Sequence, residues 1–217
     1  RLIQGALKVP FVSYKGNLFN DAAVVLPTDI EPTITPATRS TALSNGWAWQ
    51  IPLTNRYGNG YVYSRDYLSE EQAEAELRQH LGLESSPVAA RHLTMKVGRV
   101  EKHWAKNCLA VGVSQGFIEP LEATALALTY GTGSQFLSSF DKGDSLDNFN
   151  AQINEKFEGV RDYIVCHYKV NQRRDTDYWR DNARNKNLSD NLQRILYAWH
   201  NSETFAEDLY REQLMGS

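Results

Sequence analysis

The sequence predicts an α/β fold in which a sheet-forming first half precedes a helical second half, an α+β arrangement within these 217 residues. Three patterns predict it. Two alternating runs joined by an Asn/Gly-rich segment indicate a β-hairpin over 46–63. A capped amphipathic segment indicates a helix over 69–82. Apolar residues at helical spacing indicate long helices over 120–140 and 145–170.

Composition is that of an ordinary soluble globular protein, with 41% hydrophobic and 23% charged residues. The net charge of -3 and the absence of Lys/Arg runs predict neither nucleic-acid nor anionic-membrane binding, and no apolar stretch is long enough for a membrane span. Cys108 and Cys166 stand in apolar runs, which predicts buried thiols and a cytoplasmic location. The five histidines lack metal-ligand spacing, so no metal is expected.

The ends of the chain interrupt helical patterns. The sequence opens on "RLIQGALKV" without a Met and closes on "EDLYREQLMGS", still inside an amphipathic pattern. These features predict that the chain is an internal piece of a longer protein.

The elements of the first half follow in order. A short strand is predicted over 21–27 and a Pro/Thr-rich loop over 28–38. In the hairpin, Trp47 and Trp49 share one face. Ser69 caps the following helix with Gln72 in a capping box, and Gly82 ends it. Further strands are predicted over 91–99 and, as a buried strand, over 107–113.

The second half is predicted to be helical. Pro120 suits the first turn of a helix that continues to about residue 140. The next helix covers 145–170, with Phe149, Ile153 and Phe157 on one side. The last covers 189–205.

The joint "NCLAVGVSQGFIEPLEATALAL" carries the strongest chemical signal. A strand, a turn of small residues and a helix start would aim backbone N–H groups and the positive end of a helix dipole at one place. Such a place binds anions. Many joints of this kind bind nothing, so both interpretations stay open at this point.

Two kinds of side chain are candidates for chemistry. Glu119 and Glu122 flank Pro120, where acids usually serve the helix dipole. Glu122 stands among Leu, Ala and Thr, which predicts a poorly solvated carboxylate. The indoles of Trp47 and Trp49 could pack in a core or form a wall against a ligand.

Several stretches, in order, resemble the flavin-dependent tryptophan halogenase family. "GWAWQIP" resembles its W-x-W-x-I-P signature, preceded by "TRSTA" and followed by "RYGNGYVYS". "GRVEKHWAKNCLAVGVSQGFIEPLEATAL" is similar to the segment that enters its flavin and halide site. "EKFEGVRDYIVCHYKV" and "RRDTDYW" resemble its later helical region.

The resemblance implies a fold and a reaction. Residues 1–140 would be part of a flavin-monooxygenase-type FAD-binding domain, and 141–217 a mostly helical substrate-side module. Reduced FAD from a separate flavin reductase would react with O2 and chloride or bromide to give hypohalous acid. That species would halogenate an aromatic, tryptophan- or indole-like substrate, with the protein separating the steps.

The resemblance also implies residue roles. Glu122 matches the catalytic glutamate beside the substrate. Thr124 and Ala125 match the pair whose backbone N–H groups hold the halide. Val113 and Leu126 match backbone contacts to FAD. The signature indoles, Trp47 and Trp49, would line the region near the flavin.

The sequence differs from the family pattern at some positions and lacks some family motifs. Ala123 replaces a common Ser, and Ala125 a common Gly or Ser. These 217 residues contain no G-x-G-x-x-G loop, and Lys96, Lys102 and Lys106 do not match the catalytic lysine of the family.

Two alternatives to halogenation stay open: a flavin monooxygenase that hydroxylates, or an inactive piece of such an enzyme that by itself binds FAD weakly or not at all. A homodimer is also left open.

Overall fold

The computed structural model describes residues 2–202 and 204–207. Its strands are β1 (Phe11–Ser13), β2 (Ala22–Thr28), β3 (Arg39–Leu43), β4 (Gly46–Pro52), β5 (Tyr57–Tyr63), β6 (Arg91–Thr94), β7 (Gly98–Val100), β8 (Trp104–Ala105), β9 (Cys108–Leu109) and β10 (Gly116–Phe117). Its helices are α1 (Glu70–Leu81), α2 (Thr124–Lys142), α3 (Leu146–Val170), α4 (Asp177–Arg184) and α5 (Asp190–Asn201). Short helical turns cover Leu2–Ala6, Gly112–Ser114 and Leu121–Ala123. The predicted order, a sheet-forming half before a helical half, is confirmed.

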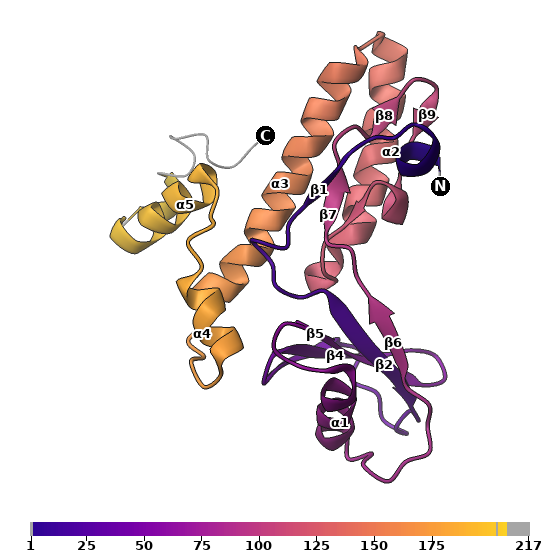
Figure 1. Ribbon diagram of the computed structural model, residues 1–217, viewed down its shortest axis with the longest axis vertical. Helices are drawn as coiled ribbons and strands as arrows, with labels where there is room; N and C mark the ends of the chain where they lie inside the picture. Colours follow the sequence, from indigo (N-terminus) through magenta and orange to yellow (C-terminus); the bar gives the residue numbers. More distant parts are fainter. Residues whose placement is uncertain (1, 203, 208–217) are drawn as a thin grey trace.

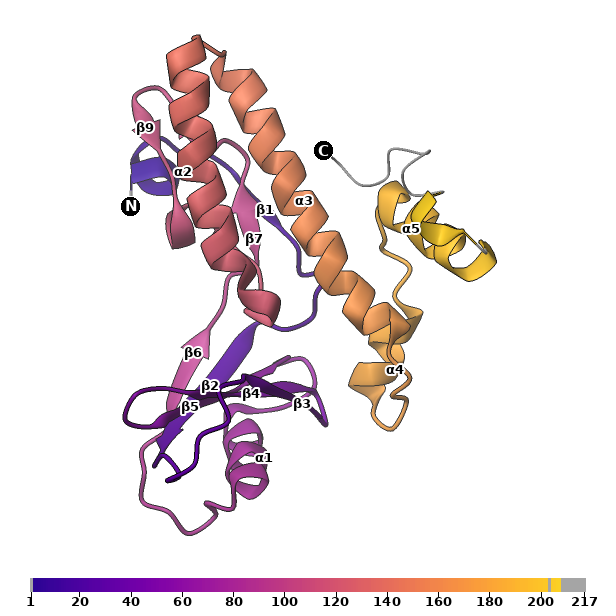
Figure 2. The ribbon, with the colours of Figure 1, turned by 180° about the vertical axis from the view of Figure 1, so that it is seen from behind.

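The molecule is elongated (Figure 1). The larger sheet, with α1 against it, occupies one end, and the antiparallel pair α2 and α3 extends to the other. α4 lies at the sheet-side end of α3, and the chain then turns back so that α5 lies to one side of α3. Seen from behind, the start of α2 lies at the waist between the helical pair and the larger sheet (Figure 2).

The larger sheet has the order β3-β4-β5-β2-β6, and its neighbouring strands are antiparallel. The predicted hairpin is confirmed, because β4 pairs with β5 and places Trp49 opposite Gly60. The strand predicted over 21–27 is confirmed as β2. Since side chains alternate between faces, Trp47 and Trp49 lie on one face of β4 and Ala48 on the other.

Helix α1 covers the Ala48 face of the sheet. Its predicted start is confirmed: Ser69 Oγ accepts a hydrogen bond from the Gln72 N–H, and the Gln72 side chain accepts one from the Ser69 N–H. Gly82 ends it in the left-handed conformation at φ 67°. Ala73 and Leu77 are fully buried against this sheet face.

The Trp47 face of the sheet is covered by the helical half. One apolar core joins the sheet to α3, α4 and α5. Its fully buried members include Ala23, Val62, Phe149, Ile153, Phe157, Ile164, Tyr178 and Leu192. The sheet therefore lies between α1 on one face and the helical module on the other.

The single strand predicted over 91–99 is wrong, because two strands in different sheets cover it. β6 pairs with β2, whereas β7 lies between β1 and β10 in a smaller sheet. Gly98 begins β7 at φ 141°, where an added Cβ would lie 2.2 Å from the Val12 carbonyl oxygen. The chain changes sheets at this point, which apolar alternation alone does not reveal.

The buried strand predicted over 107–113 is also wrong. Only Cys108 and Leu109 are in a strand, paired with β8. Gly112 has φ 59° and turns the chain into a single 3-10 turn, which leaves Val113 82% exposed. Within this segment Ala110 is buried and Cys108 and Leu109 are partly buried, whereas Val111 and Val113 are exposed.

The helical half matches the prediction in part. The helix predicted over 145–170 is confirmed as α3, and Ser145 caps it. α4 was not predicted; Thr176 caps it, and the Trp179 indole N–H donates to the Leu43 carbonyl at 2.8 Å. α5 ends at Asn201, short of the predicted residue 205. The amphipathic pattern over 208–215 lies outside the described residues.

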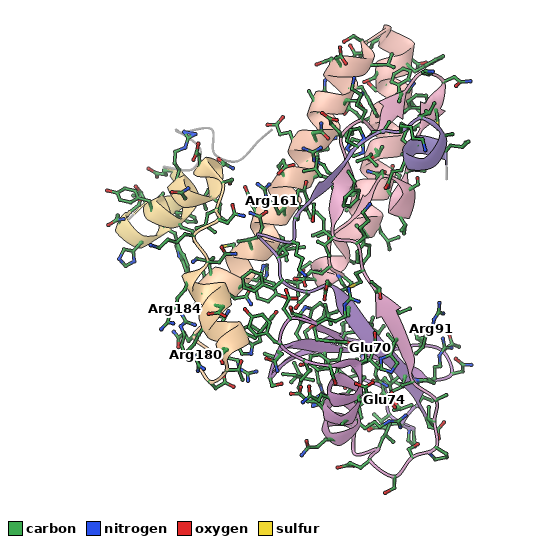
Figure 3. All side chains as sticks on the ribbon, viewed as in Figure 1. Glu70, Glu74, Arg91, Arg161, Arg180 and Arg184 are labelled. Carbon is green, nitrogen blue, oxygen red and sulfur yellow. The ribbon has the colours of Figure 1, made fainter. Side chains whose placement is uncertain are left out.

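A polar network joins α3 to the smaller sheet. Glu158 accepts hydrogen bonds from the Tyr14 hydroxyl and the Arg99 guanidinium, both at 2.8 Å. Arg161, labelled on α3 in Figure 3, pairs with Glu158 and with Asp162. These charges are paired where the helix meets the sheet, as partly buried charges must be.

Both cysteines are free thiols, and both are half-buried rather than fully buried as predicted. Partial burial raises the pKa of Cys166. Among the described residues, no helix has the length and apolar character needed to cross a membrane.

Candidate functional site

The site is built around residues 118–124, here called the Glu122 turn, which connects β10 to α2. Within it, Glu122 and Ala123 have φ values of 60° and 54°. A residue with a Cβ in this left-handed region carries about 1–2 kcal/mol of strain. Two in succession are uncommon, and strain of this kind concentrates at functional sites.

The left-handed pair corrects the predicted helix start. Pro120 was expected in the first turn of a continuous helix, but a separate 3-10 turn follows it, and α2 begins at Thr124. Helical periodicity does not reveal this break, because neither left-handed residue is a glycine.

Glu122 is exposed in this structure, as is Ala123. The predicted poor solvation of Glu122 is therefore wrong for the described chain. Its apolar neighbours Leu121 and Thr124 are themselves only partly buried, so they do not exclude water from the carboxylate.

Glu119 is the desolvated carboxyl of the turn, with 0% exposure. Its Oε2 accepts a hydrogen bond from Asn20 Nδ2 at 2.6 Å. The same amide nitrogen donates to the Tyr168 hydroxyl at 2.8 Å, and the Tyr178 hydroxyl donates to Asn20 Oδ1 at 2.9 Å. A buried polar cluster thus joins the turn to α3 and α4.

Burial raises the pKa of Glu119 to about 7, since desolvation disfavours the charged form. The nearby polar groups of Tyr168, Asn20 and Trp47 oppose this rise. The Trp47 indole nitrogen and Glu119 Oε1 are both buried without a hydrogen bond of normal geometry. The Trp47 indole therefore lies close enough to Glu119 to oppose the rise in its pKa, without a hydrogen bond of normal geometry.

The start of α2 has no side-chain cap, because the preceding residue is Ala123. The first N–H groups of an α-helix have no acceptor within it, so the backbone amides of Thr124 and Ala125 face the strained turn at the positive end of the dipole. The Thr124 hydroxyl is buried and has no hydrogen-bond partner. An acceptor or an anion would satisfy these groups.

The two signature indoles occupy different environments. Trp47 is 7% exposed and belongs to the core, whereas Trp49 is partly buried. Their ring centroids are 6.0 Å apart. The Trp49 ring lies over Gly60, where a Cβ would come within 2.2 Å of it.

Val113 and Leu126, the residues matched to FAD contacts, are both exposed. The turn that carries Val113 packs against α2, and the buried Gln115 side chain donates to Thr132 Oγ1 at 2.9 Å. An exposed apolar surface continues along α2. It comprises Leu126, Tyr130, Leu137 and Phe140.

The structure thus brings together part of the predicted site. The Glu122 turn leads directly into α2, and the Val113 turn packs against α2 near Thr129 and Thr132. Trp47 approaches Glu119 rather than Glu122. From its sequence, Glu119 was expected only to interact with the helix dipole, and neither Asn20 nor Tyr168 was expected in the site. The sequence could have indicated burial of two of them. Glu119 stands between Ile and Pro in an apolar run, and Tyr168 continues the buried face of α3.

Metal chemistry has no candidate ligands here. Across 2–202 and 204–207, no group of three or more His, Cys, Asp or Glu side chains is placed to hold an ion.

Comparison with known proteins identifies the family. The sequence profile of the tryptophan halogenase family matches residues 1–214. The chain is 40% identical over 216 residues to the 7-chloro-L-tryptophan 6-halogenase KtzR of Kutzneria sp. (strain 744). This match covers 96% of this chain and 42% of KtzR. The chain is 36% identical over 203 residues to the tryptophan 7-halogenase RebH of Lentzea aerocolonigenes, covering 88% of this chain and 37% of the relative.

Solved structures agree with the sequence comparison. The tryptophan 6-halogenase SttH from Streptomyces toxytricini superposes with a TM-score of 0.85 at 41% identity, covering 91% of this chain and 42% of that one. BrvH, a flavin-dependent halogenase from Brevundimonas sp. BAL3, superposes with a TM-score of 0.83 at 42% identity, covering 91% and 41%.

The chain spans about two-fifths of the length of the relatives that it matches. The profile match extends over nearly all of its residues, and the ordered motifs and the fold agree with it. The chain therefore belongs to the tryptophan halogenase family.

Proposed function

We propose that the protein containing this chain is an FAD-dependent halogenase that places a halogen on an aromatic, tryptophan- or indole-like substrate. Family membership supports the reaction class. The observation that carries the proposal is the Glu122 turn. It presents a carboxylate and the uncapped start of α2 within three residues of each other, at a strained turn.

The amides of Thr124 and Ala125 are proposed to bind chloride or bromide. They begin a helix of 19 residues, so the dipole adds to their attraction for an anion. The side chain at 125 does not contribute, since backbone N–H groups form the contact. The departure from Gly or Ser at this position therefore leaves the donors in place.

Glu122 is proposed as the catalytic carboxylate. Because halogenation replaces a ring hydrogen, the reaction releases a proton, and a carboxylate beside the ring can accept it. The same carboxylate can orient hypohalous acid toward the ring through a hydrogen bond. The left-handed backbone fixes the direction in which this side chain leaves the turn.

The residues present fit part of an FAD site. The exposed, adjacent Val113 and α2 segments offer apolar surface and backbone groups to a flavin edge, and Trp49 is partly buried next to the core. Reduced FAD, supplied by a separate flavin reductase, would contribute the O2 chemistry that oxidises the halide. The remaining FAD contacts would come from sequence that these 217 residues do not include, since no G-x-G-x-x-G loop is present.

The proposed organisation assigns 1–140 to the FAD-binding and halogenase domain and 141–217 to the substrate-side module. The division falls at the end of α2, whose last residue is Lys142. The buried cluster around Asn20, which joins the two parts, supports a close coupling between them.

The test supplies the complete protein with FAD, a flavin reductase, bromide and tryptophan or indole. Mass spectrometry of the product should show replacement of one hydrogen by bromine. A hydroxylated product that contains no halogen would instead establish the monooxygenase alternative and end the proposal.

A further inference from the structure

The strained Glu122 turn needs an anchor. Two successive left-handed residues would relax if the adjoining chain were free. Glu122 and Ala123 are exposed, so burial of their own side chains does not hold the turn. Anchoring must therefore come from the flanking residues.

Glu119 is the polar anchor on the β10 side. It is fully buried and only three residues from Glu122. Its Oε2 is held at 2.6 Å by Asn20, which lies in the loop before β2, 99 residues away in sequence. Burying a carboxyl is costly unless hydrogen bonds compensate, so its retention at this position calls for a reason beyond packing.

The surroundings of the carboxyl come from four separate segments. Asn20 donates a hydrogen bond to it from the loop, Tyr168 of α3 and Trp47 of β4 lie beside it, and Tyr178 of α4 reaches it through Asn20. The titratable groups facing it are the two tyrosine hydroxyls. A single side chain thus connects the turn to the signature strand and to the helical module.

We infer that Glu119 is a positioning residue whose buried carboxyl, held by Asn20, fixes the left-handed turn that carries Glu122. Its part in turnover rests on the proposed function, whereas its part in holding the turn does not. A change in the charge of this carboxyl alters the hydrogen bond to Asn20 and so shifts the turn.

Glu119→Gln is the informative variant, because it keeps the size and one acceptor oxygen but cannot ionise. Asp162→Asn is the matched control. Asp162 is another buried acid that receives hydrogen bonds, on α3 and outside the turn. Circular dichroism checks that both variants fold.

The first measurement uses the full 217-residue chain labelled with ¹⁵N, whose amide signals are followed from about pH 5.5 to about pH 9. Burial raises the pKa of Glu119 to about 7. The amides of Glu122, Ala123 and Thr124 and the Trp47 indole N–H should therefore shift together near that pH, in the natural chain and in Asp162→Asn. They should not shift in Glu119→Gln.

Turn amides that stay still in the natural chain, or that shift equally in Glu119→Gln, would overturn the inference. This measurement does not depend on halogenation, so it tests whether Glu119 holds the turn even if the proposed function is wrong.

The second measurement uses the complete protein. Glu119→Gln should lower kcat by about 10–100-fold with little change in the KM for the aromatic substrate, because misplacing a reacting group slows the chemical step. Asp162→Asn should retain the natural kcat. An unchanged kcat in Glu119→Gln would refute the role in turnover while leaving the halogenase proposal intact.

Discussion

Helices α1 and α2 begin in opposite ways. α1 begins with a complete capping box, in which Ser69 and Gln72 satisfy each other's backbone N–H groups. α2 begins after Ala123, which offers no cap and is held in a left-handed conformation. The first arrangement stabilises a helix that covers a sheet face. The second leaves backbone donors and a carboxylate at one strained turn.

The difference shows where stability and function separate in this chain. Local rules of helix formation are obeyed at α1, where packing is the only task visible in the structure. They are broken at α2, where we propose that the chemistry takes place. The comparison can be tested by changing each helix start in turn.

The largest effect is expected at Glu122 in the complete protein. Glu122→Gln removes the proposed proton acceptor and should lower kcat by about 10²–10⁴-fold. Ser69→Ala, at the start of α1, should leave kcat unchanged. Steady-state halogenation assays measure both, and full activity in Glu122→Gln would remove this carboxylate from the mechanism.

The next effect concerns the pH dependence of stability. The pKa of Glu119 rises from its ordinary 4.5 to about 7 on folding. Between these values the folded chain binds more protons than the unfolded chain, so the free energy of unfolding falls as pH rises and levels off above about pH 7. The loss amounts to roughly 3 kcal/mol.

Glu119→Gln should abolish this fall. Urea unfolding at about pH 4.5 and about pH 7.5 should show the variant gaining stability relative to the natural chain at the higher pH. If the unfolding free energy changed by the same amount between the two pH values in both proteins, Glu119 would not carry a raised pKa.

The capping box of α1 should have a smaller effect. Ser69→Ala leaves the Gln72 N–H without its acceptor and should cost about 1 kcal/mol of unfolding free energy. Urea denaturation measures it, with Ser86→Ala as a loop-serine control. An unchanged unfolding free energy in Ser69→Ala would indicate that water replaces the capping hydrogen bond without loss of stability.

The smallest effects are expected from two Ala→Gly substitutions that should change the unfolding free energy in opposite directions. Ala123→Gly should raise the unfolding free energy by about 1 kcal/mol, since glycine adopts the left-handed conformation without strain. Ala75→Gly, at an exposed position inside α1, should lower it by about 0.5–1 kcal/mol. Destabilisation by both changes would show that the backbone at 123 is not strained.

Sequence patterns were sufficient where the determinants are local. The capping box at Ser69, the paired runs around Trp47 and Trp49, and the apolar spacing of α3 each depend on residues close together in sequence. The structure confirms all three.

The site was harder to predict because its determinants are not local. Whether Glu119 or Glu122 is buried depends on Asn20 and Tyr168, 99 residues before Glu119 and 49 after it. The left-handed backbone at Ala123 has no glycine to signal it. Family resemblance supplied the residue roles, but only the folded chain distinguishes the two carboxyls.

The bare backbone at Gly60 gives a means of moving the Trp49 ring. Because the Trp49 ring rests where a side chain at 60 would begin, even a methyl group there must displace the indole, although the signature motif itself stays untouched. Substitutions of increasing size at this one position would therefore form a graded series that displaces the Trp49 ring by increasing amounts.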